Sequence, residues 1–182
     1  MILVVDMNWK KDSLGYFETV APIVALVEEF EEATVRHYKE LKAEDLAASS
    51  KSILSGTTLK DTAFLEDPTK FVCLKDTNKP VLGICAGMEA IGIAFGLQLK
   101  QILEIGMTQI TTLRINPLYS GTFKAYSLHN YAVEPATNFE ALAESAKCVQ
   151  AIKHKNKPIY GILFHPEVRN IEIIKQFIQT QH

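Results

Sequence analysis

The stretch PVLGICAGMEAIGIAF, residues 80–95, decides the fold. Its first five residues are a short apolar run of the kind that forms a strand covered on both faces, and a helical pattern follows Cys85. Gly83 and Gly87 flank the cysteine and give a tight turn the room it needs. The stretch therefore predicts a strand, a sharp turn and a helix, with Cys85 on the turn.

The same alternation of short apolar runs and longer helical patterns continues through the first half of the chain. This rhythm is typical of parallel strands joined by crossover helices, so it predicts an α/β fold with a central, mostly parallel sheet flanked by helices. Pro22 leaves two possibilities open for the first helical segment: a kink, or a main helix that begins there with proline in its first turn. The predicted strands are residues 2–6, 34–38, 52–56 and 80–84, and the predicted helical segments are residues 14–30, 43–48 and 63–74.

The pattern changes after the helix that follows Cys85. Short runs are now separated by Asn, Pro, Gly and Lys residues, which is typical of hairpins and predicts a small mixed or antiparallel extension in the second half. A final helix at about residues 170–179 is expected to close the fold. The predicted strands of the extension are residues 109–115, 122–128, 131–134, 149–154 and 158–164.

The bulk composition predicts one compact domain, residues 1–182, because 47% of the 182 residues are hydrophobic. A formal net charge of -2 argues against a nucleic acid partner, since no global basic field would hold a phosphate backbone. No apolar run is long enough to span a bilayer, so no membrane association is expected. The apolar start, residues 2–6, has no basic leader and is predicted to be a buried strand rather than a signal peptide.

The cysteines argue for a reducing, cytoplasmic location. Cys73, Cys85 and Cys148 are an odd number without a CxxC pair, which argues against a disulfide framework and a structural zinc site. Histidines and cysteines do not cluster at ligand spacings in the sequence, so no metal site is expected. We expect Cys73 and Cys148 to be structural.

Cys85 is the candidate nucleophile. A strand–turn–helix places such a side chain at the carboxyl end of a central strand, and the amino terminus of the following helix favours thiolate over thiol. A cysteine in an apolar run is more often a small core residue. The flanking glycines and the position at the end of the strand favour the nucleophile.

His165 and Glu167, in PIYGILFHPEVRN at residues 158–170, are the candidate base and its orienting acid. Pro166 biases His165 towards an extended backbone, in which residues two apart point to the same side. A nucleophile, a base and an acid that holds the base's tautomer make a triad. A His-Pro-Glu tripeptide on its own is more often a surface turn. Its occurrence together with the predicted turn at Cys85 is what favours a catalytic site. The other histidines considered, His37, His154 and His182, have weaker settings, and His182 lies at the terminus, where disorder is the default.

An attack by Cys85 on a carbonyl group would develop an oxyanion. The backbone N–H of Ala86, next to the nucleophile, is placed to receive it. Gly56, which ends the run SILSG at residues 52–56, is the candidate second donor, because a loop glycine lets a backbone amide approach a ligand closely. An ordinary strand-ending turn is the alternative for Gly56.

Three segments, GICAGME at 83–89, SILSG at 52–56 and ILFHPEV at 162–168, together resemble the class I, or triad, glutamine amidotransferases. The similarity covers nearly the whole chain. Within the family, residues 148–168 look most like the stand-alone glutaminase subunits of archaeal-type GMP synthases. The resemblance implies a flavodoxin-like fold and a thioester on Cys85, with His165 as the proton shuttle and Gly56 and Ala86 as oxyanion donors.

The resemblance also implies where the substrate, L-glutamine, would bind. AYSLHNYAV, residues 125–133, is similar to a family segment that helps to hold the glutamine backbone, which places Ser127, Leu128, His129 and Tyr131 near the substrate. Glu89 takes the position of a family glutamine. A carboxylate there could meet the substrate's α-ammonium group but would repel its carboxylate.

The chain departs from the family pattern at three further positions. Thr57 and Thr58 follow Gly56 where a second glycine and often a proline are usual, and Met88 stands where GMP synthase-like sequences have histidine. Trp9 and two lysines replace a polar first turn. An exposed Trp9 would be a partner-docking residue, although a tryptophan that covers the sheet edge is the commoner arrangement.

The resemblance implies a partner, because released ammonia needs an acceptor and the chain has no ATP-binding P-loop. We expect a separate ATP-pyrophosphatase synthetase subunit, with ATP and magnesium bound only by that partner and no cofactor in this chain. Xanthosine monophosphate is the expected acceptor, and anthranilate, carbamoyl phosphate or imidazole glycerol phosphate synthesis are alternatives. Two other possibilities are a catalytically impaired regulatory or binding subunit with the same fold, and a cysteine hydrolase of another γ-glutamyl compound.

Overall fold

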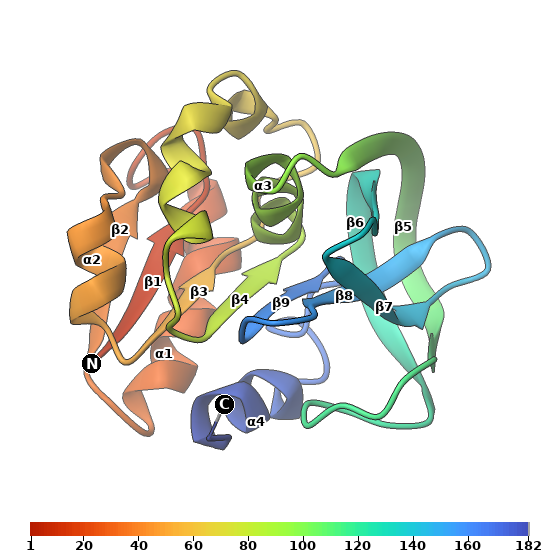
Figure 1. Ribbon diagram of the computed structural model, residues 1–182. Helices are drawn as coiled ribbons and strands as arrows, with labels where there is room; N and C mark the ends of the chain where they lie inside the picture. Colours follow the sequence, from red (N-terminus) through yellow and green to blue (C-terminus); the bar gives the residue numbers. More distant parts are fainter. Residues whose placement is uncertain (182) are drawn as a thin grey trace.

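The computed structural model describes residues 1–181, and His182 lies outside the described residues. A nine-stranded sheet runs through the protein in the order β2-β1-β3-β4-β9-β8-β7-β5-β6 (Figure 1). The first five strands in this order are parallel, and the pairings from β9 to β6 are antiparallel. The predicted α/β class, with its parallel centre and antiparallel extension, is confirmed.

The strands of the parallel half are short and buried at the centre. Every residue is buried in β1 (Ile2–Asp6), β4 (Val81–Ile84) and β9 (Ile159–Ile162), because helices cover both faces of this half. The remaining strands are β2 (Ala33–His37), β3 (Lys51–Leu54), β5 (Gln98–Thr112), β6 (Thr122–Glu134), β7 (Phe139–Glu144) and β8 (Val149–His154).

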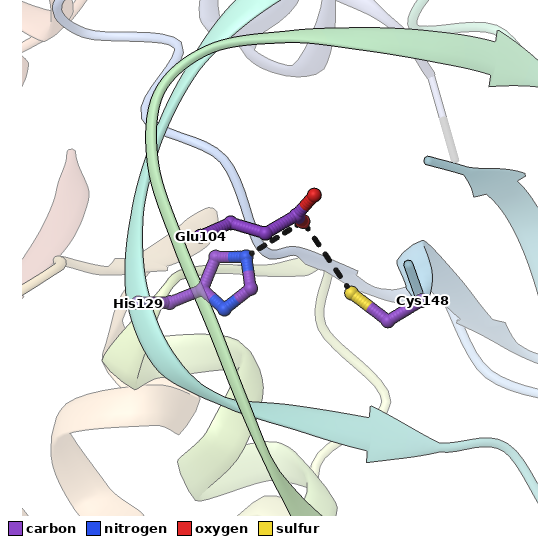
Figure 2. Close-up of side chains that lie close together, drawn as sticks. All are labelled: Glu104, His129 and Cys148. Carbon is purple, nitrogen blue, oxygen red and sulfur yellow. Dashed lines mark hydrogen bonds and ion pairs between the residues drawn. The ribbon is translucent and has the colours of Figure 1, made fainter. Parts of the chain in front are cut away.

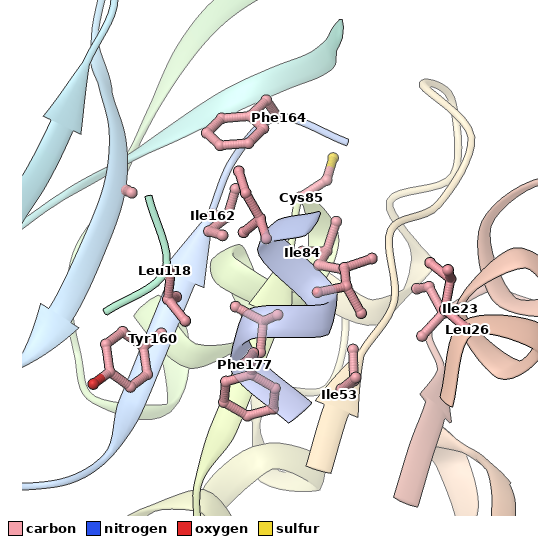
Figure 3. Close-up of a cluster of buried hydrophobic side chains, with 14 of the residues drawn as sticks. Ile23, Leu26, Ile53, Ile84, Cys85, Leu118, Tyr160, Ile162, Phe164 and Phe177 are labelled. Atoms are coloured by element: carbon pink, nitrogen blue, oxygen red, sulfur yellow. The ribbon is translucent and has the colours of Figure 1, made fainter. Parts of the chain in front are cut away.

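Two hydrophobic clusters lie on the two faces of the sheet. Ile2 and Val4 belong to one cluster and Leu3 and Val5 to the other, because successive side chains of a strand point to opposite faces. The first cluster packs under α1 (Ala21–Glu28) and α4 (Glu172–Gln179), and the second under α2 (Ala43–Ala48) and α3 (Ala86–Ala94). Figure 3 shows the first cluster, with Cys85 at one end of it.

The structure decides the question that Pro22 left open. Pro22 lies in the first turn of α1, where proline needs no hydrogen-bonded N–H, and a π-helical turn, Tyr16–Val20, leads directly into that helix. The predicted helical segment at 63–74 is instead two 3-10 helices, Ala63–Leu65 and Pro68–Lys75. Pro68 is the first residue of the second 3-10 helix, a position at which the backbone N–H that proline lacks would have no acceptor within the helix.

The antiparallel extension is larger than expected. The two predicted runs at 122–128 and 131–134 form one continuous strand, β6, and its partner β5 begins at Gln98, well before residue 109. Strand β7, FEALAE, was not predicted, because alanine and glutamate favour helices. Among the described helices, none has the length and apolar character required to cross a membrane.

Candidate active site

Cys85 lies on a strained turn between β4 and α3. Its backbone has φ 49° and ψ −105°, a left-handed value that is rare outside glycine. Its N–H donates to the carbonyl oxygen of Ile162 at 2.7 Å, which ties the turn to the end of β9. A Cβ atom on Gly83 would collide with the carbonyl of Gly87, and one on Gly87 would collide with the carbonyl of Leu54. Only glycines therefore allow this turn to close.

His165 and Glu167 lie just beyond the end of β9. The His165 Nδ1 and the Glu167 Oε1 are 2.7 Å apart, and both side chains are almost fully buried. The His165 N–H donates to the Tyr126 carbonyl oxygen at 2.8 Å, which positions the backbone. Because β4 and β9 are parallel neighbours in the sheet, their carboxyl ends meet at one edge and bring this pair to Cys85.

The Cys85 thiol and the His165 imidazole are adjacent, and each shifts the pKa of the other. The Cys85 Sγ contacts the Leu128 carbonyl oxygen at 3.5 Å, and the His165 Nε2 has no hydrogen-bond partner in the described part of the chain. Catalytic hydrogen bonds are often loose without substrate and tighten when it binds. The free Nε2 is the ring nitrogen that is available to take the thiol proton.

The buried setting shifts the pKa of both groups. Burial raises the pKa of the Cys85 thiol, and His165 opposes this shift. Burial lowers the pKa of His165, but Cys85 and Glu167 outweigh it and hold the imidazole pKa well above its usual value. The opposed shifts couple the two groups, because the imidazole holds a proton most firmly when the neighbouring sulfur is a thiolate.

Gly56 and Ala86 lie where the oxyanion donors were predicted. A Cβ atom on Gly56 would lie 2.6 Å from the His165 Cε1 and 3.5 Å from the Cys85 Cβ, so the Gly56 backbone sits directly against Cys85 and His165. Ala86 is the first residue of α3, and its N–H has no acceptor within the helix. The assignment of the two amides as oxyanion donors stays a prediction.

A small pocket lies beside Cys85. Its volume is only about 10 Å³, roughly the space of one water molecule. The loop after β3 closes over it: the Thr57 Oγ1 donates to the Asp61 carbonyl at 3.1 Å, and the Asn130 Nδ2 donates to the Leu59 carbonyl at 2.5 Å. Any ligand larger than a water molecule therefore requires this loop to move. The lining comprises Thr57, Thr58, Leu59, Asp61, Thr62, Phe64, Cys85, Ala86, Glu89, Leu128, His129, Asn130 and Tyr131.

Glu89 is buried on the wall of this pocket, in the first turn of α3. Burial raises the pKa of its carboxyl group to about 8, although His165 acts in the opposite direction. At neutral pH the group therefore carries a proton and can donate a hydrogen bond. A protonated carboxyl group has the shape and the donor and acceptor of an amide, so it mimics the glutamine that the family has here.

The predicted substrate segment is only partly at the pocket. Leu128 and Tyr131 line it, as Glu89 does. Ser127 is not among the lining residues, and its Oγ is buried without a hydrogen-bond partner in the part of the chain described. His129 lines the pocket, but its ring is held by Glu104 and by the Ile102 carbonyl. His129 therefore lies on the pocket wall, and its place near the substrate stays a prediction.

Sequence reasoning missed several residues of the pocket. Asn130, Asp61 and Phe64 line it, and none of them was singled out. Asn130 lies inside the segment that was identified, one residue from His129, so a one-residue change of register would have found it. The loop residues carry no signal of their own, because their place depends on how the chain folds over Cys85.

A second cluster of chemically active side chains lies apart from Cys85. Glu104, His129 and Cys148 bring an oxygen, a nitrogen and a sulfur atom within 4.8 Å of one another (Figure 2). The sequence spacing of the histidines and cysteines did not predict this cluster, and the expectation that Cys148 is structural stays a prediction. Residues 104, 129 and 148 are far apart in the sequence, and only the antiparallel strands bring them together.

Comparison with known proteins points to one family. Residues 22–181 match the family model described as glutamine amidotransferase class-I. The chain is 38% identical over 112 residues to a glutamine-hydrolyzing GMP synthase subunit of Methanocaldococcus jannaschii, covering 56% of this chain and 60% of that protein. It is 35% identical over 116 residues to the corresponding GMP synthase subunit of Saccharolobus solfataricus, covering 58% and 62%. These matches span about 60% of the length of the curated relatives.

Solved structures share the fold over nearly the whole chain. A crystal structure from Thermoplasma acidophilum, assigned as a GMP synthase subunit, superposes with a TM-score of 0.81 at 24% identity, covering 97% of this chain and 91% of that one. A glutamine amidotransferase from Thermotoga maritima superposes with a TM-score of 0.72 at 18% identity, covering 98% and 81%. At these identities the likeness concerns the fold.

Proposed function

Because the chain belongs to the class-I glutamine amidotransferase family, we propose that it is a glutaminase subunit that hydrolyses L-glutamine and passes ammonia to a separate synthetase. The observation that carries the proposal is the meeting of Cys85, His165 and Glu167 at one edge of the sheet. Glu89, Leu128 and Tyr131 line the neighbouring pocket, where the substrate would bind.

The first half of the reaction forms a thioester. His165 takes the thiol proton through Nε2, and the Cys85 sulfur attacks the side-chain amide carbon of glutamine. Glu167 holds the Nδ1–H of the ring and stabilises the imidazolium. The N–H groups of Gly56 and Ala86 would receive the oxyanion. The imidazolium then gives its proton to the leaving nitrogen, and ammonia departs.

The second half hydrolyses the thioester. His165 takes a proton from a water molecule as that water attacks the γ-glutamyl carbonyl carbon. The Cys85 sulfur leaves with the proton that the imidazolium returns, and glutamate is released. The same base and the same oxyanion donors serve both halves, so one site completes the cycle.

The proposed ammonia acceptor is xanthosine monophosphate, converted to GMP on an ATP-pyrophosphatase subunit. The names of the similar subunits from M. jannaschii and S. solfataricus support this acceptor and a partner acting in trans. ATP and magnesium would be bound by that partner, and this chain contributes no cofactor. Anthranilate, carbamoyl phosphate and imidazole glycerol phosphate synthesis are the other acceptor pathways of the same chemistry.

A link from the surface to the pocket supports activation by the partner. Trp9 is 57% exposed, so it does not cover the sheet edge, and Leu14 and Phe17 are exposed in the same segment. The Trp9 N–H donates to the Asp61 Oδ2 at 2.7 Å, and Asp61 lines the closed pocket. A synthetase that binds this segment would shift the equilibrium between the closed and the open arrangement of the loop beside Cys85.

A catalytically impaired binding subunit is the second candidate. The observation that favours it is the small pocket, together with Thr57 in the oxyanion loop and Glu89 in place of a family glutamine. Such a protein would keep the fold and the partner interface without turning over glutamine. Chemical labelling separates the two candidates.

The decisive test of the catalytic proposal is labelling with an electrophilic diazo-ketone analogue of glutamine, followed by mass spectrometry. The proposal predicts one adduct on Cys85, protection by glutamine and no adduct in Cys85→Ser. Labelling should leave Cys73 and Cys148 unmodified, which provides an internal control. No adduct on Cys85, even with the partner present, would support the binding-subunit candidate.

The acceptor is tested by mixing the chain with the candidate synthetase, ATP, magnesium, glutamine and xanthosine monophosphate. GMP should form with glutamine, and with Cys85→Ser it should form only when ammonia is supplied. Glutamate release should rise when the synthetase is present. Equal glutamine turnover with and without the synthetase would contradict partner activation, and release of glutamate without GMP would point to another pathway.

A further inference from the structure

We propose that Glu104, His129 and Cys148 form a binding site for a borderline divalent transition-metal cation of the zinc type. The three side chains come from β5, from β6 and from the residue that precedes β8 (Figure 2). They offer a carboxylate oxygen, an imidazole nitrogen and a sulfur, which is a donor set that zinc accepts in proteins. None of the three proposed catalytic residues, Cys85, His165 and Glu167, belongs to this site.

The spacing of the three donor atoms is close to that of a tetrahedral site. The Glu104 Oε2 lies 3.2 Å from the His129 Nε2 and 3.6 Å from the Cys148 Sγ. In a tetrahedral zinc site with bonds of about 2.0–2.3 Å, donor atoms lie roughly 3.3–3.8 Å apart. All three donor atoms lie within 4.8 Å of one another, so only a small shift of side chains is needed.

The hydrogen bonds of His129 present a lone pair to Glu104. The His129 Nδ1 lies 3.1 Å from the Ile102 carbonyl oxygen, which only accepts, so Nδ1 carries the hydrogen. In the neutral ring Nε2 is then an acceptor, and it faces a carboxylate oxygen, which also accepts. Two buried acceptors in contact need a proton or a cation between them.

The carbonyl contact at Nδ1 is also the arrangement that metal-bound histidines use. A ligating imidazole usually donates its other N–H to a carbonyl or carboxylate, which fixes the tautomer and the ring orientation. His129 is almost fully buried, so its orientation is set by these two contacts. The ring is thus already turned for ligation.

Gln150 supplies a second, independent observation. It is fully buried, and its Nε2 donates to the Glu104 Oε2 at 2.5 Å and to the Cys148 Sγ at 3.3 Å. Its Oε1 is buried and has no hydrogen-bond partner among the described residues. Rotation of the amide would exchange the two atoms and present Oε1 to the cation as a fourth donor. After this rotation the Gln150 Oε1 would bind the cation and would no longer lack a partner.

The cation has a route to the site. A surface cavity of about 590 Å³ is lined by Ile102, Ser145 and Cys148, among other residues, and Cys148 is only partly buried. On binding, the Cys148 thiol would release its proton to solvent, a sulfur–metal bond would form, and a water of the hydrated ion would leave. The bound ion would tie β5 and β6 to β8.

The position of His129 connects this site to the pocket wall. Leu128, its neighbour in β6, contacts the Cys85 Sγ through its carbonyl oxygen. An ion that fixes His129 therefore also fixes the strand that borders Cys85. The proposed role of the ion is to stabilise the β6 side of the pocket. The test measures metal binding and needs no assay of enzymatic activity.

The test is a titration of the Cys85→Ser chain with Zn²⁺ and with Co²⁺. The Cys85→Ser substitution is needed because Cys85, His165 and Glu167 offer the same three kinds of donor atom as the proposed metal site. The proposal predicts one equivalent of Zn²⁺ by calorimetry, a Tm that rises with Zn²⁺, and a thiolate-to-cobalt charge-transfer absorption with Co²⁺. Absence of binding in this chain would overturn the proposal and would mean that a proton joins His129 and Glu104.

Variants then locate the ion. Adding Cys148→Ser to the background should abolish the charge-transfer absorption, and Cys73→Ser, the matched change of another partly buried cysteine, should leave it intact. Gln150→Ala should weaken Zn²⁺ binding about 10- to 100-fold. If Cys148→Ser fails to fold, His129→Gln replaces it, with circular dichroism as the check. Unchanged absorption and affinity in a folded Cys148→Ser or His129→Gln variant would overturn the assignment.

Discussion

Glu89 takes the position at which the family resemblance implies glutamine, and burial decides the charge of its carboxyl group. An ionised carboxylate in this pocket would repel the α-carboxylate of glutamine. With its pKa raised to about 8, the group stays neutral at neutral pH and keeps the donor and the acceptor of an amide. Below about pH 8 the substitution therefore leaves a neutral side chain at this position.

The first prediction concerns Glu89→Gln and folding stability. The folded state holds a proton on Glu89 between pH 4.5 and about 8 that the unfolded state releases, so the wild-type contribution is full below 4.5 and is lost as pH rises to about 8. The variant does not titrate. Its free energy of unfolding should therefore rise relative to that of wild type between pH 5 and pH 8, by up to about 1.4 kcal/mol per pH unit, and its Tm should rise accordingly. Parallel Tm–pH curves for the two proteins would contradict the buried, protonated carboxyl group.

A second prediction at this scale is the loss of activity in Glu167→Gln. The amide would offer a donor to Nδ1 and favour the wrong tautomer, so Nε2 would carry the hydrogen and could not accept the thiol proton. We expect kcat for glutamine hydrolysis to fall about 10²- to 10⁴-fold with little change in Tm. Glu66→Gln, on the surface, is the matched control and should retain full activity. Retained activity in Glu167→Gln would remove the residue from the triad.

At the scale of elements, the contact between β6 and the loop after β3 controls access to Cys85. Asn130 in β6 donates to the Leu59 carbonyl of the loop, and Thr57 closes the loop on Asp61. Each is a single hydrogen bond of ordinary strength, worth about 0.5–1.5 kcal/mol. The closed arrangement is therefore one that a ligand or a partner can reverse.

The third prediction follows from this contact. Asn130→Ala should raise the open population of the loop about 2- to 10-fold, the equivalent of the lost bond. The measurement is the rate of Cys85 alkylation by iodoacetamide, followed by mass spectrometry with Cys73 as the internal reference. Asn138→Ala, an exposed asparagine outside the pocket, should leave the rate unchanged. An unaltered Cys85 rate in Asn130→Ala would show that this bond does not hold the loop closed.

At the scale of the whole molecule, the exposed segment near Trp9 lies at the same edge of the sheet as the catalytic residues. It follows β1, whose carboxyl end lies beside those of β3 and β4. The Trp9–Asp61 hydrogen bond joins the segment to the pocket loop. A partner that binds this segment, as proposed, would meet the protein at the sheet edge that carries Cys85.

The fourth prediction is that Trp9→Ala weakens binding of the synthetase without loss of stability. Truncation of a central aromatic residue in an interface commonly costs about 2 kcal/mol or more, so the Kd should rise at least about tenfold. Calorimetric titration measures it, and Ile105→Ala, a change of similar exposure on β5, is the control. If Trp9→Ala leaves both partner affinity and stability unchanged, this segment is not the docking surface.

The amino-acid sequence by itself determined the local features of this protein. Short apolar runs with helical patterns between them predict the parallel strands, and Gly-x-Cys-x-Gly predicts the strained turn at Cys85, because both depend on neighbouring residues. His165 and Glu167 are two residues apart, so their pairing also follows from local geometry. The meeting with Cys85, 80 residues earlier, was an expectation that followed from placing both segments at strand ends.

Only the tertiary structure decided which distant side chains share a site. Asn130 closes the pocket because β6 passes over the loop after β3, and Cys148 meets Glu104 and His129 because β5, β6 and β8 curl together. The same holds for the carboxyl group of Glu89, whose protonation depends on the burial that the whole fold imposes. The sequence specifies which side chain stands at each position. The distances between distant side chains and their burial depend on how separate segments pack, and no local sequence pattern predicts that packing.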